Sequence, residues 1–297
     1  MTLLDAAGRA PAAAARRPLR LFGERGAYWA LLLPAVLLML VFYIYPLTQV
    51  LWVSVTEPSF GLENYERLFT SASIHNVLLT TLRICTATTV VTLLLGYVVA
   101  YVLTHASDRA QRLMLLGVLL PLWISVLVRA FAWVTLLRRE GLVNNSLLAL
   151  GLIEEPLPLM WNELGISIGM VHYMLPFAVL PLWAGMRDID PRCLAAARGL
   201  GASRLQTFAR VFLPLSLPGI IGAAVLVFIF SLGFFVTPAI LGGGKTLMIS
   251  EFISVQILDL VRWGVGAMLA TTLVATIFLA LALLARVVDL GKLFGAK

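Results

Sequence analysis

The chain has 297 residues, of which 61% are apolar and 12% are charged, whereas soluble domains are about half apolar and a quarter charged. This composition excludes a soluble globular enzyme and indicates several membrane-spanning helices. The net charge of +7 would suit nucleic acid, but lysine and arginine of membrane proteins gather on the cytoplasmic side, so we expect no nucleic-acid partner.

Six apolar stretches have the length of about 20 residues that a bilayer core requires. They are residues 29–51, 84–103, 113–137, 164–186, 219–241 and 265–287. The first is too long for the apolar core of a cleaved signal peptide. Residues 1–27, rich in Ala and Arg, predict a disordered cytoplasmic tail, and residues 28–297 the transmembrane domain. We therefore predict an all-α membrane protein with about six transmembrane helices.

Lysine and arginine are unequally divided between the two sides that these spans define. Most lie on the side of both termini, and the opposite loops hold only Arg67, Arg138, Arg139, Lys245 and Arg262. The positive-inside rule therefore places both termini in the cytoplasm.

Other classes of membrane protein lack their expected residues. No Ser/His/Asp arrangement, paired carboxylate or metal-ligand spacing occurs within the spans, which disfavours an intramembrane enzyme. Cys85 lies in a span and Cys193 in a cytoplasmic loop, so we expect no disulfide. A secondary transporter or channel that works without an ATPase is the alternative, but the sequence shows neither an inverted repeat nor coupling carboxylates in the spans.

The loop between the fourth and fifth spans, residues 188–214, is the most informative segment. Asp190 followed by Pro191 predicts a helix start, and Gly201 permits the left-handed backbone that ends a helix. Ser203 with Gln206 predicts a capping box that starts a second helix.

This second helix has an apolar face and a predicted end. Leu205, Phe208, Ala209 and Phe212 are spaced to share one face, and Pro214 predicts a stop before the fifth span. The resulting helix–glycine–helix element either transmits force from a soluble partner or lies on the lipid as an amphipathic pair.

The loop resembles the "EAA" loop of ABC importer permeases, which reads Glu-Ala-Ala, three residues, Gly, and a downstream Leu-Pro. The matching residues are Ala196, Ala197, Gly201, Ala202, Leu213 and Pro214. The family's glutamate position is Ala195 here, and its second acidic position is Gly199, so any contact made through those acids is in doubt. Arg198 and Arg204 are candidates to compensate.

Three further segments, residues 121–133, 141–145 and 231–242, resemble the spermidine/putrescine-type branch of these permeases. The resemblance implies a multi-pass subunit of the bacterial inner membrane, which forms the translocation pathway and hydrolyses nothing itself. Its expected partners are a cytoplasmic ATPase dimer that binds ATP and Mg, a second and different permease chain, and a periplasmic or extracellular binding protein. The branch favours a polyamine-like organic cation, while organic acids, amino-acid derivatives and metal chelates stay open.

The resemblance also assigns residues to ATPase coupling. They are Leu194, Ala196, Ala197, Arg198, Gly201, Ala202, Arg204 and Phe208. No cofactor is expected in this chain itself.

Ionisable and aromatic residues inside the spans indicate the pathway, because charged groups there are costly. Arg129 predicts a gate or substrate contact, with pairing to Glu140 or Glu163, or snorkelling, as alternatives. His172 predicts an interhelical hydrogen bond, and Arg83, at a span edge, predicts snorkelling. The candidate pathway or gate residues are Arg129, Trp133, Tyr173, Phe234, Phe235 and Thr237. Ordinary packing is the alternative for the last three, which precede Pro238.

Residues 242–246, Gly-Gly-Gly-Lys-Thr, have the composition of a phosphate-binding loop. That motif requires a glycine at position 239, which is alanine, and the segment follows a span that ends outside. We therefore predict a periplasmic turn here.

Overall fold

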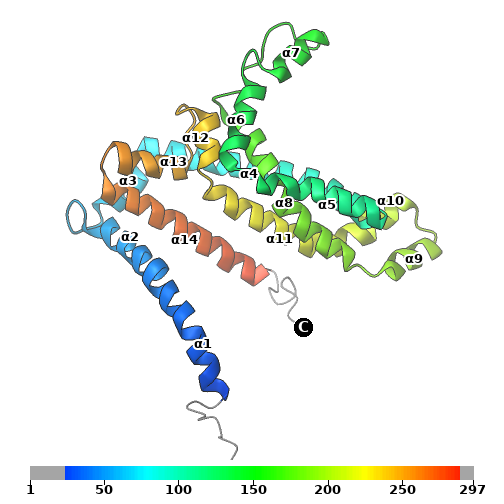
Figure 1. Ribbon diagram of the computed structural model, residues 1–297, viewed down its shortest axis with the longest axis horizontal. Coiled ribbons are helices and arrows are strands. Elements are labelled where there is room, and N and C mark those ends of the chain that lie inside the picture. Colours follow the sequence, from blue (N-terminus) through cyan, green and yellow to red (C-terminus); the bar gives the residue numbers. More distant parts are fainter. Residues whose placement is uncertain (1–23, 288–297) are drawn as a thin grey trace, which may run out of the picture. The chain divides into compact units, whose positions relative to one another are not determined.

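The computed structural model describes residues 24–287, and in this range the regular elements are all helices (Figure 1). The chain divides into two units, residues 1–49 and 50–297. The first contains α1 (Glu24–Met39), the π-helical turn η1 (Leu40–Ile44) and the start of α2 (Tyr45–Thr56). These form one continuous apolar span, Leu31–Thr56. The predicted tail 1–27 falls largely outside the described residues, as does the C-terminal end from residue 288.

The second unit holds the remaining helices. In chain order they are α3 (Glu63–Thr70), α4 (Ala72–His105), α5 (Asp108–Trp123), α6 (Val126–Leu137), α7 (Leu142–Ala149), α8 (Glu163–Arg187), α9 (Pro191–Gly199), α10 (Arg204–Thr207), η2 (Phe208–Phe212), α11 (Leu213–Leu232), α12 (Val236–Gly242), α13 (Ile249–Ser254), η3 (Val255–Asp259) and α14 (Trp263–Val287).

Helices α4, α8 and α11 form the centre of this unit, and α8 and α11 lie side by side in Figure 1. Their close approach depends on small residues, as is usual between membrane helices. A Cβ on Gly96 of α4 would lie 3.1 Å from the Cβ of Ala178 on α8. A Cβ on Gly185 of α8 would lie 3.3 Å from the Cα of Gly219 on α11. The core between them is apolar, with Met174 fully buried.

Within residues 24–287, five helices are long and apolar enough to cross a membrane, or six if the bent pair α5 and α6–α7 counts as one span. The predictions for residues 164–186 and 265–287 agree closely with α8 and α14, and α4 extends beyond both ends of the predicted 84–103.

The predicted span 113–137 corresponds to a broken helix, which bends by 99° between α5 and the helical segment that begins at Val126. The bend follows Pro121. The Ile124 amide donates a hydrogen bond to the Pro121 carbonyl at 3.2 Å, three residues back, which closes a tight turn at the end of α5. Ile124 and Ser125 then adopt extended backbone, with ψ of 134° and 137°. Proline supplies no amide to the helical ladder, which weakens the helix at this place.

The predicted span 219–241 overlaps α11 but extends past its end. Helix α11 ends at Leu232, and α12 starts anew at Val236 after a break at 233–235. Pro238 explains the break, because in a continuous helix its ring would clash with the carbonyl of Phe234.

At the other end of α11 the predicted stop at Pro214 is absent. Helix α10, the π-helical turn η2 and α11 run without interruption over Arg204–Leu232. The Leu213 amide bonds to the Phe208 carbonyl, which makes a wide turn just before the proline. Such a turn accommodates the proline ring, and the loop helix is therefore the beginning of the span.

Candidate functional site

The cytoplasmic loop forms the predicted helix–glycine–helix element. Helix α9 begins at Pro191, and the Asp190 carboxylate accepts a bond from the Arg192 amide at 2.8 Å. Gly201 has a φ of +88°, in the left-handed region, and its amide bonds back to the Arg198 carbonyl at 3.0 Å. The turn between the two helices therefore depends on this glycine.

The second helix starts with the predicted capping box. The Gln206 amide donates to Ser203 Oγ at 3.2 Å, and the Ser203 amide donates to Gln206 Oε1 at 2.9 Å. Because both helix ends that meet at the turn have their backbone groups satisfied, the element is held in one conformation.

The inner face of the element packs on the bundle. Leu194 and Phe208 contact the central core, and Phe212 is buried there. The ring of Tyr101 on α4 lies edge-on to Phe208 at 5.6 Å and to Phe212 at 5.3 Å. These aromatic contacts connect the element to α4 as well as to α11.

The predicted apolar face of four residues is partly wrong. Leu205 is 75% exposed and Ala209 is exposed, while Phe208 and Phe212 point inward. The π-helical turn over Phe208–Phe212 explains part of the difference, because it changes the rotation per residue, so regular i, i+4 and i+7 positions no longer share one side.

The exposed tip of the element is apolar. Leu200 follows the end of α9 and is 91% exposed, and Leu205, at the start of the second helix, is also exposed. Sequence reasoning missed Leu200, although a leucine between two glycines in a short turn has nothing to pack against. Arg198 and Arg204 line a cavity of about 250 Å³ beside this tip. Of the other predicted coupling residues, Ala196 is exposed, and Ala197 and Ala202 are half-buried.

Within the membrane, four predicted pathway residues form one cluster around α8. The Arg129 guanidinium lies 4.4 Å from the centre of the Tyr173 ring, and the rings of Tyr173 and Phe234 are 4.4 Å apart. Trp133 Nε1 donates to His172 Nδ1 at 3.1 Å, which confirms the predicted interhelical hydrogen bond. The cluster thus joins α6, α8 and the break after α11.

The expected partners of Arg129 are different from those observed. Glu163 bonds to Arg83 at 2.7 Å, and both side chains are partly exposed. Arg129 is instead buried, at 8% exposure, and contacts the Tyr173 ring. Its predicted pairing with Glu140 or Glu163 is therefore wrong.

Two predicted pathway residues lie outside the cluster, and two residues that were not predicted extend it. Phe235 is 41% exposed, and Thr237 is buried beneath Gly169. Phe177 stacks below Tyr173 at 5.9 Å, and Phe230 lies edge-on to Phe177 at 5.1 Å. The sequence spacing could have indicated this extension, because Phe177 and Phe230 each lie four residues from a cluster residue.

The break that contains Phe234 is held from α13. Ser250 Oγ donates to the Phe234 carbonyl at 2.6 Å. This carbonyl follows the end of α11, where helix carbonyls have no partner in their own helix. The bond therefore fixes the backbone beside the aromatic cluster.

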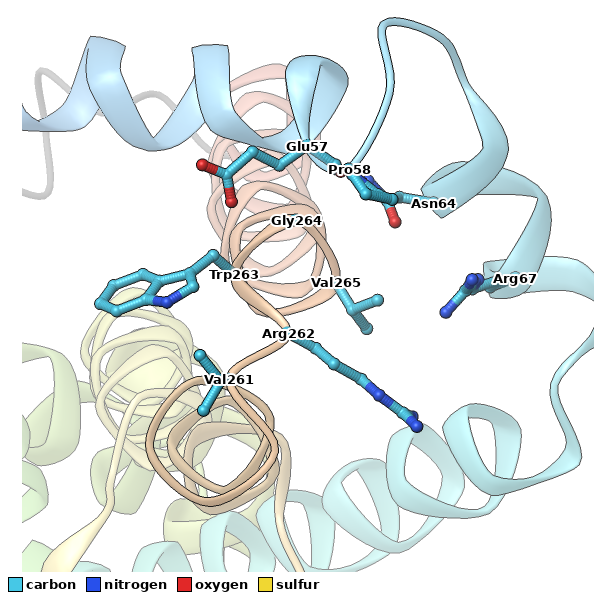
Figure 2. Close-up of a pocket in the computed structure, with 9 residues that line it drawn as sticks. All are labelled: Glu57, Pro58, Asn64, Arg67, Val261, Arg262, Trp263, Gly264 and Val265. Atoms are coloured by element: carbon cyan, nitrogen blue, oxygen red, sulfur yellow. The ribbon is translucent and has the colours of Figure 1, made fainter.

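A small pocket of about 230 Å³ lies where the end of α2, α3 and the start of α14 meet (Figure 2). Figure 2 shows Arg67 and Arg262 extending over one side and Glu57 on the other. Asn64 Nδ2 donates to the carbonyls of Ser54, at 3.1 Å, and Glu57, at 2.6 Å. Because this amide satisfies two carbonyls at the end of α2, we interpret the pocket as a structural joint.

The glycine-rich segment forms a turn, as predicted. Gly243 and Gly244 have φ values of +55° and +71°, and Lys245 Nζ lies 5.3 Å from the centre of the Trp161 ring. The described residues contain no group of three potential metal ligands.

A membrane bundle with two broken helices and a capped cytoplasmic element defines a transport permease. The chain belongs to the family of binding-protein-dependent transport system inner membrane components, whose family profile matches residues 92–290. This range contains both the cytoplasmic element and the aromatic cluster. The protein is therefore a multi-pass protein of the bacterial inner membrane and a membrane-spanning subunit of an ABC importer.

Curated relatives narrow the branch. The chain is 38% identical to the spermidine/putrescine transport system permease protein PotB of Escherichia coli (strain K12) over 225 residues, which are 76% of this chain and 81% of that protein. It is 32% identical to PotB of Haemophilus influenzae over 240 residues, 81% of this chain and 78% of that protein. These relatives are transport permeases, which confirms the resemblance seen in the sequence.

Solved structures share the fold. A bacterial alginate ABC transporter, crystallised with an alginate pentasaccharide-bound periplasmic protein, has a chain that aligns with a TM-score of 0.74 at 20% identity, covering 85% of this chain and 90% of that one. A second alginate ABC transporter structure gives a TM-score of 0.67 at 21% identity, covering 88% and 95%.

Proposed function

We propose that this chain forms part of the translocation pathway of a polyamine importer and is driven by a cytoplasmic ATPase dimer, which binds ATP and Mg. The carrying observation is the capped element of residues 188–214, whose apolar tip at Leu200 faces the cytoplasm in the predicted orientation. Leu200 and Leu205 are 91% and 75% exposed on the two helices that meet at the Gly201 turn, which supports contact of this tip with a partner protein.

The substrate class rests on the relatives and on the cluster. The PotB proteins are named for spermidine and putrescine. Tyr173, Phe177, Phe230 and Phe234 form a continuous series of rings, and aromatic faces attract ammonium groups. The transmembrane domain 28–297 would line one half of the pathway, with a second, different permease chain completing it and a periplasmic binding protein delivering substrate.

The test compares two truncations on the same helix. Leu200→Ser removes the apolar tip, and Arg192→Ser is the matched control, because the Arg192 side chain is 93% exposed. The tagged permease is purified with its associated subunits, and ATP-driven uptake into vesicles is measured for spermidine, putrescine, an organic acid and a metal chelate.

We expect Leu200→Ser to lower ATPase retention and uptake about tenfold or more, as for a central interface residue, with Arg192→Ser close to wild type. Equal retention in both variants would contradict the coupling role of the tip. Uptake of the organic acid or chelate in place of polyamines would contradict the substrate class alone. Uptake without any ATPase would support the alternative transporter.

A further inference from the structure

Arg129 carries a charge that the described part of the chain does not neutralise. The side chain is 8% exposed, and its Nε and Nη1 atoms are buried with no hydrogen-bond partner among the described residues. Its charged contact is with the face of the Tyr173 ring. Because an unpaired charge at membrane depth is costly, such a residue usually marks a transport pathway.

The position of Arg129 connects both broken helices. It lies in the first turn of α6, where its amide bonds to the Ser125 carbonyl at 3.1 Å, directly after the first break. Phe234 lies in the second break, and its ring contacts the same tyrosine. Tyr173 on α8 is therefore contacted by a residue one turn after the first break and by a residue of the second, and discontinuous helices are where transporters commonly place their binding sites.

The surroundings strengthen the effect of this charge. The guanidinium lies over the Tyr173 ring, which in turn packs on Phe234, and an apolar setting screens a charge far less than water. Arginines in transport pores use such a field to exclude cations.

We propose that Arg129 is the closed gate of this pathway: its guanidinium occupies the cation-binding face of Tyr173 and blocks the leak of cations until α6 moves away from α8. The proposal rests on the proposed pathway. An ammonium substrate and the Arg129 guanidinium compete for the same ring face. Passage of the substrate therefore requires the arginine to leave the ring. The ATPase-driven movement of α6 away from α8 would displace it.

The experiment measures leak without ATP. The complete transporter is reconstituted into liposomes loaded with K⁺ and radiolabelled putrescine, and efflux of each is followed in wild type, Arg129→Gln and Arg129→Lys. Arg83→Gln is the matched control, because Arg83 also lies on a membrane helix but is exposed and paired with Glu163.

We expect Arg129→Gln to raise the leak of both cations about tenfold or more, with Arg129→Lys and Arg83→Gln near wild type. An unchanged leak in Arg129→Gln, or an equal leak in Arg129→Lys, would overturn the proposal. Should Arg129→Gln not assemble, Arg129→Met removes the same charge with an unbranched side chain and should also leak, and a tight Arg129→Met variant would overturn the proposal. The K⁺ readout is independent of the cargo, so failure of the polyamine assignment in ATP-driven uptake is distinguished from failure of the gate.

Discussion

Replacing Gly169 by alanine should push α12 away from α8. A Cβ at this position would lie 2.5 Å from Leu241 Cδ1 and 2.7 Å from Thr237 Cγ2, whereas ordinary contacts begin at 3.4 Å. The Leu241 and Thr237 side chains, or α12 with them, must therefore shift by roughly 1 Å to restore normal contact distances. Overpacking of this size costs about 1–3 kcal/mol.

Gly117 on α5 provides the matched control. It is also a glycine inside a membrane helix, but a Cβ added there would have no described atom beyond the local backbone within 4 Å. Alanine gains about 1 kcal/mol over glycine in helix propensity at both sites, so this gain cancels in the comparison. The two variants should then differ in stability by about 1–3 kcal/mol.

Thermal unfolding of the purified transporter and polyamine uptake are the two assays. Gly169→Ala should unfold at a lower temperature than Gly117→Ala, and its uptake should fall, because α12 follows directly after the Phe234 break. Equal unfolding temperatures and equal uptake in the two variants would refute the argument that α12 is seated on Gly169.

Three further outcomes follow from side-chain contacts. Arg83→Gln should change stability by less than about 1 kcal/mol, because its ion pair with Glu163 is largely exposed, and added salt should reduce even this effect in thermal unfolding. Trp133→Phe removes the donor to His172 and should destabilise the transporter by about 1 kcal/mol in the same assay, and no loss would mean that the bond is replaced by another partner. Burial raises the pKa of Glu251 on α13, so the folded protein retains this proton to higher pH than the unfolded chain. Stability from this group is therefore lost as pH rises through the raised pKa, and Glu251→Gln should be more heat-stable than wild type at about pH 8 but not at about pH 4, whereas parallel pH profiles would contradict it.

Helix existence was predictable from sequence, but helix continuity was not. Spans α4, α8 and α14 follow from length and hydropathy alone. The breaks at Ser125 and Phe234 lie in sequence that is as apolar as the unbroken spans, so hydropathy does not detect them. Only the neighbouring prolines give a local signal. Pro214 shows the opposite error, because a π-helical turn, formed by backbone shifts rather than by a residue type, lets the helix continue.

The candidate site divides in the same way. The caps at Asp190, Ser203 and Gly201 are local backbone chemistry, so the sequence predicts them correctly. Arg129 was recognisable as unusual because it is a charge in a span. Its contact with Tyr173 depends on how α6 bends and packs, and no local pattern encodes that bend angle.

The uninterrupted helix Arg204–Leu232 also has a mechanical consequence. It meets α8 closely at Gly219, near its midpoint, where a Cβ on Gly185 would lie 3.3 Å from the Gly219 Cα. Side chains, including the Phe177–Phe230 pair, pack between the same two helices. At 1.5 Å per residue, the arms on either side of this point are each about 20 Å long. A tilt of about 10° around it would swing the two ends by roughly 3.5 Å in opposite directions, so the helix has the geometry of a seesaw. A displacement of the cytoplasmic end would then move the end of the helix beside Phe234 in the opposite direction and by a similar distance.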